Sequence, residues 1–318
     1  EGLALINGTQ FILEHAVLIV DKLNNCLDTA NIVGAMSLDA MLGSTQPFRE
    51  ELHQLRPHAG AISVAKRLRE LLKDSFCVVL HKNCGRVQDP YSLRCMPQVH
   101  GASLDAWKHL NDVVTVELNS VTDNPVVFDE KTTISGGNFH GQPLALPLDY
   151  AALAACELGS ISERRVYLMT SGQRELPMFL ITCGGLNSGF MIPQYTAAAL
   201  VSENKSLCYP ASADSIPTSA GQEDHVSMGS ISARKTLRVV ENLEKVLAIE
   251  LLCAAQALDL RRPLKSSPVL EQCHALVRQH ISYAESDRIF ATDIETAHKI
   301  IASGALAQMG NLATGIGE

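Results

Sequence analysis

The sequence predicts an all-α fold, a bundle of long helices with polar loops at the helix ends. Aromatic residues make up only 5% of the 318 residues, whereas Ala and Leu, which favour helices over strands, are plentiful. Residues 246–258 are apolar on nearly every face, apart from Glu250 and Gln256, which is typical of a helix buried by other helices. The length would allow two domains, but no Ser/Gly-rich or charged linker divides the chain. We therefore expect residues 1–318 to form a single helical unit.

The first half of the chain contains three predicted helices. Helical patterning covers residues 9–42 and ends at a Gly-Ser-Thr turn, and a second helix is predicted over 47–73. Residues 83–97 are predicted to be irregular because a glycine and two prolines interrupt any helical period. A third helix is expected over 99–118, and the Asp-Asn-Pro turn after it precedes a short strand at 126–128.

The second half continues the helical pattern. A glycine-rich turn at 136–141 leads into a helix predicted over 143–169. Residues 176–202 carry no formal charge and exceed the length of a membrane span, but their prolines and glycines predict a loop that leads into a buried helix. That helix and the later ones are expected over 189–207, 225–260, 268–281 and 293–302.

Charge and cysteine content exclude several classes of protein. Lys and Arg number 26 against 34 Asp and Glu, a formal net charge of -8, and no basic run offers a surface for nucleic-acid phosphates. The nine cysteines include no Cys-x-x-Cys pair, which predicts reduced thiols in a cytoplasmic protein. We expect no metal site, because close Cys/His ligand spacing is absent from the sequence, and no association with a membrane.

Two polar segments near the start of the chain are candidates for a binding site. Asn7-Gly8-Thr9-Gln10 precedes a helix, where Asn7 is either an N-cap or a ligand contact. Tyr91 and Arg94 lie three residues apart, so one helical turn would place them on the same face. The planar fork of Arg94 matches a carboxylate, and Tyr91 would transfer a proton if its pKa were lowered. The alternative is a packed tyrosine and a surface arginine.

Two later segments are also unusually polar. Asn124 precedes a proline in a turn signal, and Phe139 with His140 follows a pair of glycines. Glu223 lies in the segment Gln-Glu-Asp-His. This segment provides either a functional acid or a capping box on Ser219. Together the loops offer a carboxylate binder, amides, a phenol and an acid, which suits a small zwitterionic or anionic substrate. They do not identify a reaction. The sequence contains no dinucleotide-binding, P-loop or zincin motif that would indicate another kind of site.

In these segments the sequence resembles the aromatic amino acid ammonia-lyase family, whose fold is a long-helix bundle of the fumarase/aspartase type. The Gln-Glu-Asp-His-Val-Ser-Met stretch points to the histidine branch, although Gly221 stands where the family commonly has Asn. Six motifs in order carry the resemblance: Asn7-Gly8-Thr9-Gln10, Gln88-Asp89-Pro90-Tyr91-Ser92-Leu93-Arg94, Asp123-Asn124-Pro125, Gly136-Gly137-Asn138-Phe139-His140, Ser202-Glu203-Asn204-Lys205 and Gln222-Glu223-Asp224-His225-Val226-Ser227-Met228.

The resemblance implies elimination of ammonia from L-histidine to give trans-urocanate, without an added cofactor. The family uses an electrophile, a methylidene-imidazolone formed autocatalytically from an Ala-Ser-Gly tripeptide. By motif position, Arg94 would hold the substrate carboxylate with Asn7 and Asn124, and Gln88 and Tyr91 would line the reacting centre. Phe139 would pack on the substrate or the electrophile. Glu223 would face the imidazole and could take part in proton transfer.

The front of the chain departs from the family pattern. The electrophile-forming tripeptide of the family precedes the Asn-Gly-Thr-Gln motif, together with a catalytic Tyr and a His, so we expect this chain to be the C-terminal portion of a longer enzyme. The single Ala-Ser-Gly here, Ala302-Ser303-Gly304, is expected to be a coincidence at a helix end, with Gly304 as the C-cap. Alone, the chain should be inactive until an N-terminal portion joins it.

Further expectations follow from the same resemblance. Family members are homotetramers with active sites shared between subunits, so a homotetramer is expected, and residues 246–258 should need partners to be buried. A tyrosine or phenylalanine ammonia-lyase, or an aminomutase, is the alternative within the same chemistry. A non-catalytic helical assembly or regulatory subunit is the alternative of another class; convergence of Tyr91, Arg94, Phe139 and Glu223 on one cavity would argue against it.

Overall fold

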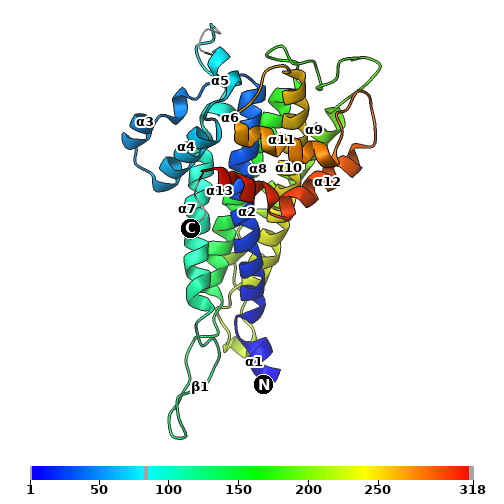
Figure 1. The fold of residues 1–318 in the computed structure, drawn as a ribbon. Helices are drawn as coiled ribbons and strands as arrows, with labels where there is room; N and C mark the ends of the chain where they lie inside the picture. The colour runs from blue at the N-terminus through cyan, green and yellow to red at the C-terminus, as the bar shows by residue number, and fades with distance from the viewer. Residues whose placement is uncertain (1, 82–84, 315–318) are drawn as a thin grey trace. The chain divides into compact units, whose positions relative to one another are not determined.

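The computed structural model describes residues 2–81 and 85–314, and it is predominantly helical (Figure 1). The all-α prediction is confirmed. The α-helices are α1 (Gly2–Asn7), α2 (Gln10–Ala40), α3 (Glu50–Gln54), α4 (Ala59–Leu71), α5 (Phe76–His81), α6 (Tyr91–Arg94), α7 (Met96–Glu117), α8 (Gln142–Thr170), α9 (Met191–Leu207), α10 (Gly229–Leu260), α11 (Pro268–His280), α12 (Phe290–Ala302) and α13 (Ala305–Thr314). The 3-10 helices are η1 (Gln46–Phe48), η2 (Ala211–Ala213) and η3 (Ser219–Gly221), and the strands are β1 (Val126–Val127) and β2 (Thr133–Ile134).

The chain forms two compact units. Unit 1 consists of Glu1–Leu23, Asp105–Cys156 and Asn204–Glu241, and unit 2 of Asn24–Leu104, Glu157–Glu203 and Asn242–Glu318. Helices α2, α7, α8, α9 and α10 each contribute a segment to both units, so the boundaries fall inside helices and not in linkers. That the chain is a single helical unit therefore stays a prediction.

Several predicted boundaries were wrong. The helix expected over 47–73 is divided into η1, α3 and α4. Arg49 has extended backbone between η1 and α3, and Pro57 separates α3 from α4 because it disfavours helical backbone in the residue before it. The longest helix begins at Gly229 and not at residue 225, so the proposed capping box on Ser219 is wrong; Ser219 starts a separate 3-10 turn. Helices α1, α5 and α13 were not predicted. The segment 83–97, predicted to be irregular, contains α6 and the start of α7, and its first two residues lie outside the described residues.

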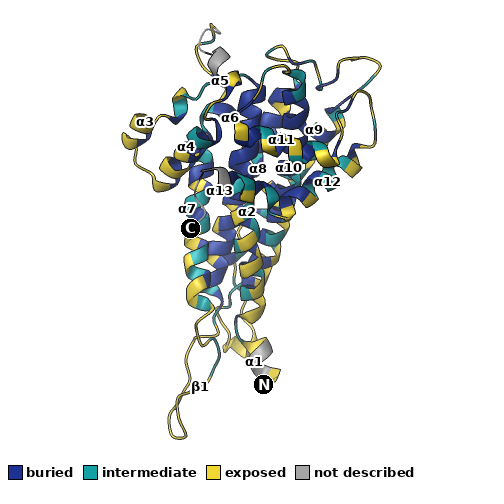
Figure 2. Cartoon of the chain, viewed as in Figure 1, coloured by how far each residue is buried: buried dark blue, intermediate teal, exposed yellow. Residues whose placement is uncertain are grey.

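The predicted strand at 126–128 is confirmed as β1, which pairs with β2 in an exposed antiparallel hairpin (Figure 2). The loop and helix predicted within 176–202 are also present, but α9 is half exposed and not buried. Among the described helices, α8 is long and apolar enough to cross a membrane, because an 18-residue stretch within it has a mean hydropathy of 1.3. However, 67% of that stretch is buried inside the protein, and a buried core helix gives the same signal.

The core of each unit uses the long helices. In unit 1, Ile19, Leu110, Leu148 and Val240 are fully buried, one from each of α2, α7, α8 and α10. In unit 2, every residue of 246–258 on α10 is at most 3% exposed. The apolar stretch of α10 is thus buried by its own chain. The expectation that it needs other subunits was wrong, because helices of the same chain already cover every face.

A buried ion pair satisfies the one acidic residue of that stretch. The guanidinium of Arg165 on α8 donates to both carboxylate oxygens of Glu250, at 2.5 and 2.9 Å, and both side chains are fully buried. Ser37 on α2 and Ser162 on α8 donate to the same carboxylate, at 2.7 and 2.5 Å. Each carboxylate oxygen therefore accepts two hydrogen bonds, which offsets the loss of water around the charge.

His100 on α7 completes this network. A guanidinium has no acceptor, so Arg165 Nη1 donates to His100 Nε2 at 3.3 Å, and His100 Nδ1–H donates to Asn31 Oδ1 at 2.9 Å. Burial first, and the Arg165 charge second, hold the pKa of His100 well below its ordinary value of 6.5. The imidazole is therefore neutral and links α7 to α2 and α8.

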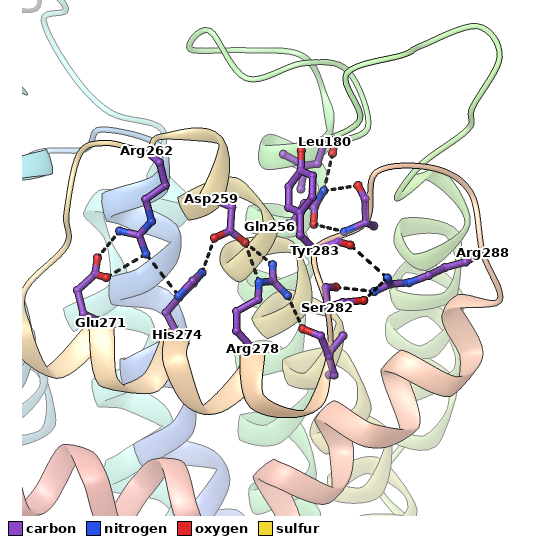
Figure 3. A network of polar contacts seen from close by, with 12 residues as sticks. Leu180, Gln256, Asp259, Arg262, Glu271, His274, Arg278, Ser282, Tyr283 and Arg288 are labelled. Carbon is purple, nitrogen blue, oxygen red and sulfur yellow. Dashed lines mark hydrogen bonds and ion pairs between the residues drawn. The ribbon is translucent and has the colours of Figure 1, made fainter.

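A second polar network joins the end of α10 to α11 and the following loop (Figure 3). Asp259 accepts from His274 Nε2 at 2.8 Å and from Arg278 Nε at 2.7 Å. Burial alone would raise the pKa of Asp259, but these two partners together lower it. The buried amide of Gln256 bonds both the carbonyl and the N–H of Ala284, at 2.9 and 3.1 Å, and so fixes residues 281–284 against α10.

Removing one partner of the Arg165–Glu250 pair should destabilise the chain strongly. Arg165→Met leaves the Glu250 carboxylate charged in the core, and breaking a buried pair costs about 3–5 kcal/mol of the free energy of unfolding. Urea unfolding measures the loss, and Arg165→Met with Glu250→Leu should recover much of it because no charge is left unpaired. The matched control is Arg49→Met, which breaks an exposed pair with Glu51. Equal losses for Arg165→Met and Arg49→Met would contradict the central role of the buried pair.

Asp39, at the end of α2, is a buried acid with one unpartnered oxygen. Its Oδ2 accepts from Ser75 Oγ at 2.8 Å and from Ser266 Oγ, whereas its Oδ1 has no hydrogen-bond partner. Burial raises the pKa of Asp39 to about 7, against the opposing effect of the two hydroxyls. The carboxyl therefore holds its proton in the folded chain at pH values where an exposed aspartate has lost it.

Asp39→Asn should remove one component of the pH dependence of stability. Because the folded pKa lies above the ordinary value of 3.8, the contribution of Asp39 is complete below pH 4 and is lost as the pH rises to about 7. The free energy of unfolding of the wild type, minus that of Asp39→Asn, should fall by on the order of 4 kcal/mol across this window. Urea unfolding between pH 4 and pH 8 measures it, with the exposed Asp112→Asn as control. A flat difference would contradict the prediction.

Candidate functional site

The predicted site residues divide between the two units. Gln88, Tyr91 and Arg94 lie in unit 2, and the others lie in unit 1: Asn7, Asn124, Phe139 and Glu223. Whether Tyr91, Arg94, Phe139 and Glu223 converge on one cavity stays a prediction.

The residues of unit 2 form a compact group on α6. The predicted single helical turn is present over Tyr91–Arg94, and it places the Arg94 guanidinium 4.7 Å from the centre of the Tyr91 ring. Arg94 Nη2 also donates to Gln88 Oε1 at 2.8 Å. Three predicted site residues are thus in direct contact. The stacked ring and the amide hold the guanidinium plane, which narrows the directions from which an anion can approach it.

A cavity of about 430 Å³ adjoins this group and is lined by Gln88, Asp89, Arg94 and Gln98, among others. Its volume is within the range of about 300–1,000 Å³ that is typical of small-molecule sites. Arg94 Nε is buried and has no hydrogen-bond partner, so one donor of the guanidinium is unsatisfied beside the cavity. Tyr91, also in the described part of the chain, does not line this cavity, and it is 71% exposed.

The residues of unit 1 are organised around Asp123. Its Oδ1 accepts from Asn7 Nδ2 at 2.9 Å and from the Asn124 backbone N–H at 2.7 Å. These bonds, that of Asn7 first, lower the pKa of Asp123. The Asn124 side chain accepts from the Gly136 N–H at 2.7 Å and from Ser135 Oγ at 3.1 Å. Asn7 is therefore not an N-cap: it ends α1, and its amide retains a second N–H for a ligand.

The other residues of the Asn-Gly-Thr-Gln motif contact the same region. Thr9 Oγ1 donates to Glu117 Oε1, at 2.5 Å, and Gln10 Nε2 donates to Thr122 Oγ1 at 3.4 Å. Gly8 lies so close to Thr122 that a Cβ there would be 2.2 Å from the Thr122 carbonyl oxygen. The motif therefore docks the start of α2 onto residues 117–123 and brings Asn7 to Asp123.

Phe139 lies in a turn that is fixed by its neighbour. His140 Nδ1 accepts from the Gln142 N–H at 3.3 Å, so Nε2 carries the proton and donates to the His225 carbonyl at 3.0 Å. The two histidine rings are stacked, with their centres 6.0 Å apart. Phe139 itself is 40% exposed, so it is not a core residue of this chain. The His140–His225 contact places the Phe139 turn beside the segment that follows Glu223.

Glu223 closes a small loop in front of α10. Its backbone pairs with that of Thr218, and its carboxylate accepts from Thr218 Oγ1. Hydrogen bonds from Thr218 first, and from Ser219 second, lower the pKa of Glu223. Gly221 has a φ of +85°, a conformation that both Gly and Asn adopt readily, which explains why Gly can stand where the family has Asn. An exposed, ionised Glu223 suits a hydrogen bond from an N–H donor better than the role of a strong base.

The single Ala-Ser-Gly tripeptide of the sequence does not fit an electrophile precursor. It lies at the end of α12, where the Gly304 N–H donates to the Ile301 carbonyl at 2.9 Å and Ser303 Oγ donates to the Ile300 carbonyl at 2.8 Å. Gly304 has a φ of +73°, as expected for a helix C-cap. An imidazolone ring forms only if the glycine nitrogen reaches the alanine carbonyl carbon, which these bonds oppose. Among the described residues, no group of three or more His, Cys, Asp or Glu side chains could hold a metal ion.

Sequence reasoning missed several residues that organise these groups. Asp123 was read only as part of a turn, although its position directly before Asn124 was a usable signal. Thr218, which bonds Glu223, and Asp89, which lines the Arg94 cavity, have no comparable signal in the local pattern. Their roles depend on contacts with residues distant in the fold.

Known proteins share the sequence and the fold of this chain. The sequence pattern described as aromatic amino acid lyase matches residues 1–279. A histidine ammonia-lyase from Natranaerobius thermophilus is 52% identical over 309 residues, which cover 96% of this chain and 61% of that protein. The crystal structure of histidine ammonia-lyase from Trypanosoma cruzi has a TM-score of 0.91 at 47% identity, covering 98% and 60%. Tyrosine aminomutase from Streptomyces globisporus has a TM-score of 0.91 at 37% identity, covering 97% and 63%. The chain thus spans about three-fifths of the length of these relatives.

Gly8→Ala should disturb the docking of the Asn-Gly-Thr-Gln motif. A Cβ 2.2 Å from the Thr122 carbonyl forces the backbone to move, and overpacking of this kind costs about 1–3 kcal/mol of the free energy of unfolding. Thermal or urea unfolding measures the change. Gly136→Ala is the matched control, because a Cβ there has no atom within 4 Å and should leave stability nearly unchanged. If both variants behave alike, the close approach at Gly8 does not constrain the fold.

Proposed function

The chain belongs to the aromatic amino acid lyase family, and we propose that it is part of an ammonia-lyase that eliminates ammonia from L-histidine to give trans-urocanate. Because it spans about three-fifths of its relatives, this activity is proposed for the whole protein. We also propose a cytoplasmic homotetramer. The eight described cysteines are all free thiols, which is consistent with a reducing compartment, whereas Cys84 lies outside the described residues.

The observation that carries the proposal is the environment of Arg94. Its guanidinium is held by Gln88 and Tyr91, lines a cavity of suitable size, and keeps one buried donor without a partner. An amino-acid carboxylate satisfies that donor through a charge-assisted hydrogen bond. Arg94 therefore binds the carboxylate and orients the substrate, with Gln88 holding the guanidinium in place.

The remaining residues take complementary roles in the proposed enzyme. Glu223, ionised, accepts a hydrogen bond from an imidazole N–H of the substrate, and Tyr91 is the candidate for proton transfer at the reacting centre. Asn7 and Asn124 supply amide contacts to the substrate, and Phe139 packs against it. The methylidene-imidazolone of the family would make the amine a better leaving group, but the Ala-Ser-Gly of this chain does not fit its precursor. We therefore propose that the electrophile comes from outside residues 1–318 and that this chain alone is inactive.

The alternatives are less well supported. A tyrosine or phenylalanine lyase, or an aminomutase, would have to place the charged Glu223 against an aromatic ring that has no N–H donor. The tyrosine aminomutase of Streptomyces globisporus is also more distant, at 37% identity, than the histidine ammonia-lyases at about 50%. A non-catalytic assembly or regulatory subunit gives no reason for an unsatisfied arginine donor beside a cavity.

Arg94→Ala in the full-length protein should weaken substrate binding. Loss of a hydrogen bond to a charged group costs about 1.5–3 kcal/mol, so KM for L-histidine should rise about tenfold or more. Steady-state kinetics of urocanate formation measure it, with Arg49→Ala on the surface as control. An unchanged KM would remove Arg94 from the carboxylate site.

Glu223→Gln should lower the kcat/KM for L-histidine, because a neutral amide is a weaker acceptor for the imidazole N–H than a carboxylate. The same variant should have little effect on binding of L-alanine, which has no ring, in competition experiments. Glu285→Gln, on an exposed loop, is the control. Indifference of histidine turnover to Glu223→Gln would place the imidazole contact elsewhere.

A further inference from the structure

Asp89 and Arg174 form a buried ion pair next to the segment that carries Gln88, Tyr91 and Arg94. Arg174 Nη2 donates to Asp89 Oδ1 at 2.8 Å, and the two side chains are 7% and 1% exposed, Arg174 first. Asp89 is the residue between Gln88 and Pro90, and Pro90 is the N-cap of α6. A fixed Asp89 therefore restrains both the amide that contacts Arg94 and the helical turn that carries it.

The same ion pair is anchored to the end of α2. The second oxygen of Asp89 accepts from the Ser44 backbone N–H at 2.7 Å, and Arg174 Nη1 donates to the Met41 carbonyl at 2.8 Å. Arg261 adds a further tie, because it donates to the Ala40 carbonyl at 2.7 Å and to the carbonyl of Arg174 itself. Cations are favoured at this end of a helix, where the free carbonyls carry partial negative charge. The pair thus connects the segment of Arg94 to a rigid helix.

The backbone at Arg174 is also unusual. Arg174 and Glu175 have φ values of +56° and +58°, in the left-handed region that is unfavourable for residues other than glycine. Gly172 just before them has a φ of +70°. Such a backbone conformation persists only where surrounding contacts stabilise it. Here the guanidinium of Arg174 makes two hydrogen bonds, one to the Asp89 carboxylate and one to the Met41 carbonyl. The turn is therefore shaped to present Arg174 to Asp89 and Met41.

We propose that Arg174 is a positioning residue, which acts through Asp89 to hold the Arg94 guanidinium in the orientation that receives the substrate carboxylate. This inference rests on the proposed function, in which Arg94 binds that carboxylate. The inference extends the proposed function by assigning a role to Arg174, which lies outside the motifs of the site. Small misplacements of a binding group have large effects, with about 1 Å costing up to about a hundredfold in rate.

The test compares two probes on the full-length protein. The first is 3-(imidazol-4-yl)propanoate, which carries the carboxylate, and the second is 4-ethylimidazole, which has the same ring without it. Their dissociation constants are measured by calorimetry for the wild type, Arg174→Met, Arg94→Ala and the combination of both. Arg174→Lys tests rescue of the charge. Because Arg174→Met leaves Asp89 charged and buried, Asp89→Asn with Arg174→Met is the second variant, in which no charge is unpaired.

The proposal expects a loss that is specific to the carboxylate. Arg174→Met alone, and Asp89→Asn with Arg174→Met, should each bind the propanoate about tenfold more weakly than the wild type. The dissociation constant of 4-ethylimidazole should stay within about twofold of the wild-type value. In the Arg94→Ala background, Arg174→Met should add no further loss, because its effect passes through Arg94. Arg174→Lys should recover part of the affinity, and turnover of L-histidine should show a raised KM with a smaller change in kcat.

Four results would overturn the inference. The first is full affinity for the propanoate in folded Asp89→Asn with Arg174→Met, while Arg94→Ala weakens propanoate binding. This result would leave the proposed function intact and show that Arg174 has no part in it. Equal weakening of both probes would assign Arg174 a general structural role. Additive losses from Arg94→Ala and Arg174→Met would show that the two act independently. If Arg94→Ala itself leaves propanoate binding unchanged, the proposed role of Arg94 fails, and the inference fails with it.

Discussion

The fold depends on satisfying one ionised carboxylate inside a helix that is buried on every face. Glu250 lies in the apolar stretch of α10, where an unpaired charge would be far more costly than an exposed one. Arg165, Ser162 and Ser37 supply its hydrogen bonds, and His100 binds the remaining side of the guanidinium. These residues come from α2, α7, α8 and α10, so a single network fixes how four long helices meet in unit 2. Gly34 on α2 permits the close approach, because a Cβ there would lie 2.7 Å from Met96 Sδ.

The same principle recurs in the polar loops, on a smaller scale. Asp89 accepts the Ser44 N–H, Asp123 the Asn124 N–H, and Asp149 the Ser212 N–H at 2.7 Å. Asp287 accepts two, from Ser188 and Gly189. Hydrogen bonds from backbone N–H groups to an ionised carboxylate are roughly twice as strong as those between neutral groups. Loops without regular structure are thus held by carboxylates, which allows them to present side chains with defined orientations.

The sequence predicted the parts of this arrangement that depend on local pattern. Helices α7 and α8 were placed within three residues at each end, because helical periodicity continues through them and Asp-Asn-Pro and Gly-Gly turns bound them. The pairing of Tyr91 with Arg94 followed from their spacing, and the contact is present. The break at Pro57 was readable and was missed, because the helical pattern on either side outweighed one proline.

Other features could not be read from local pattern. Arg174 acts through Asp89 and Met41, which are 85 and 133 residues away along the chain. Burial of residues 246–258 by the same chain was also beyond the pattern, since an apolar helix does not indicate which helices cover it. Gly8 shows the intermediate case: the motif was recognised, but the reason for glycine, the Thr122 carbonyl, becomes visible only when residues 8 and 122 meet. Long-range contacts therefore limit sequence reasoning more than helix propensity does.

Specificity in the proposed enzyme depends on two charged side chains, those of Glu223 and Arg94. Glu223 has a lowered pKa and so remains an acceptor at neutral pH, without a proton to donate. An imidazole offers it an N–H, whereas a phenyl ring offers only carbon and adds no hydrogen bond to the carboxylate. A site built around a hydrogen bond rejects a substrate that lacks the donor more strongly than a hydrophobic pocket rejects a changed shape. Glu223 would therefore select histidine less by attracting it than by excluding phenylalanine, while Arg94 binds the carboxylate common to both.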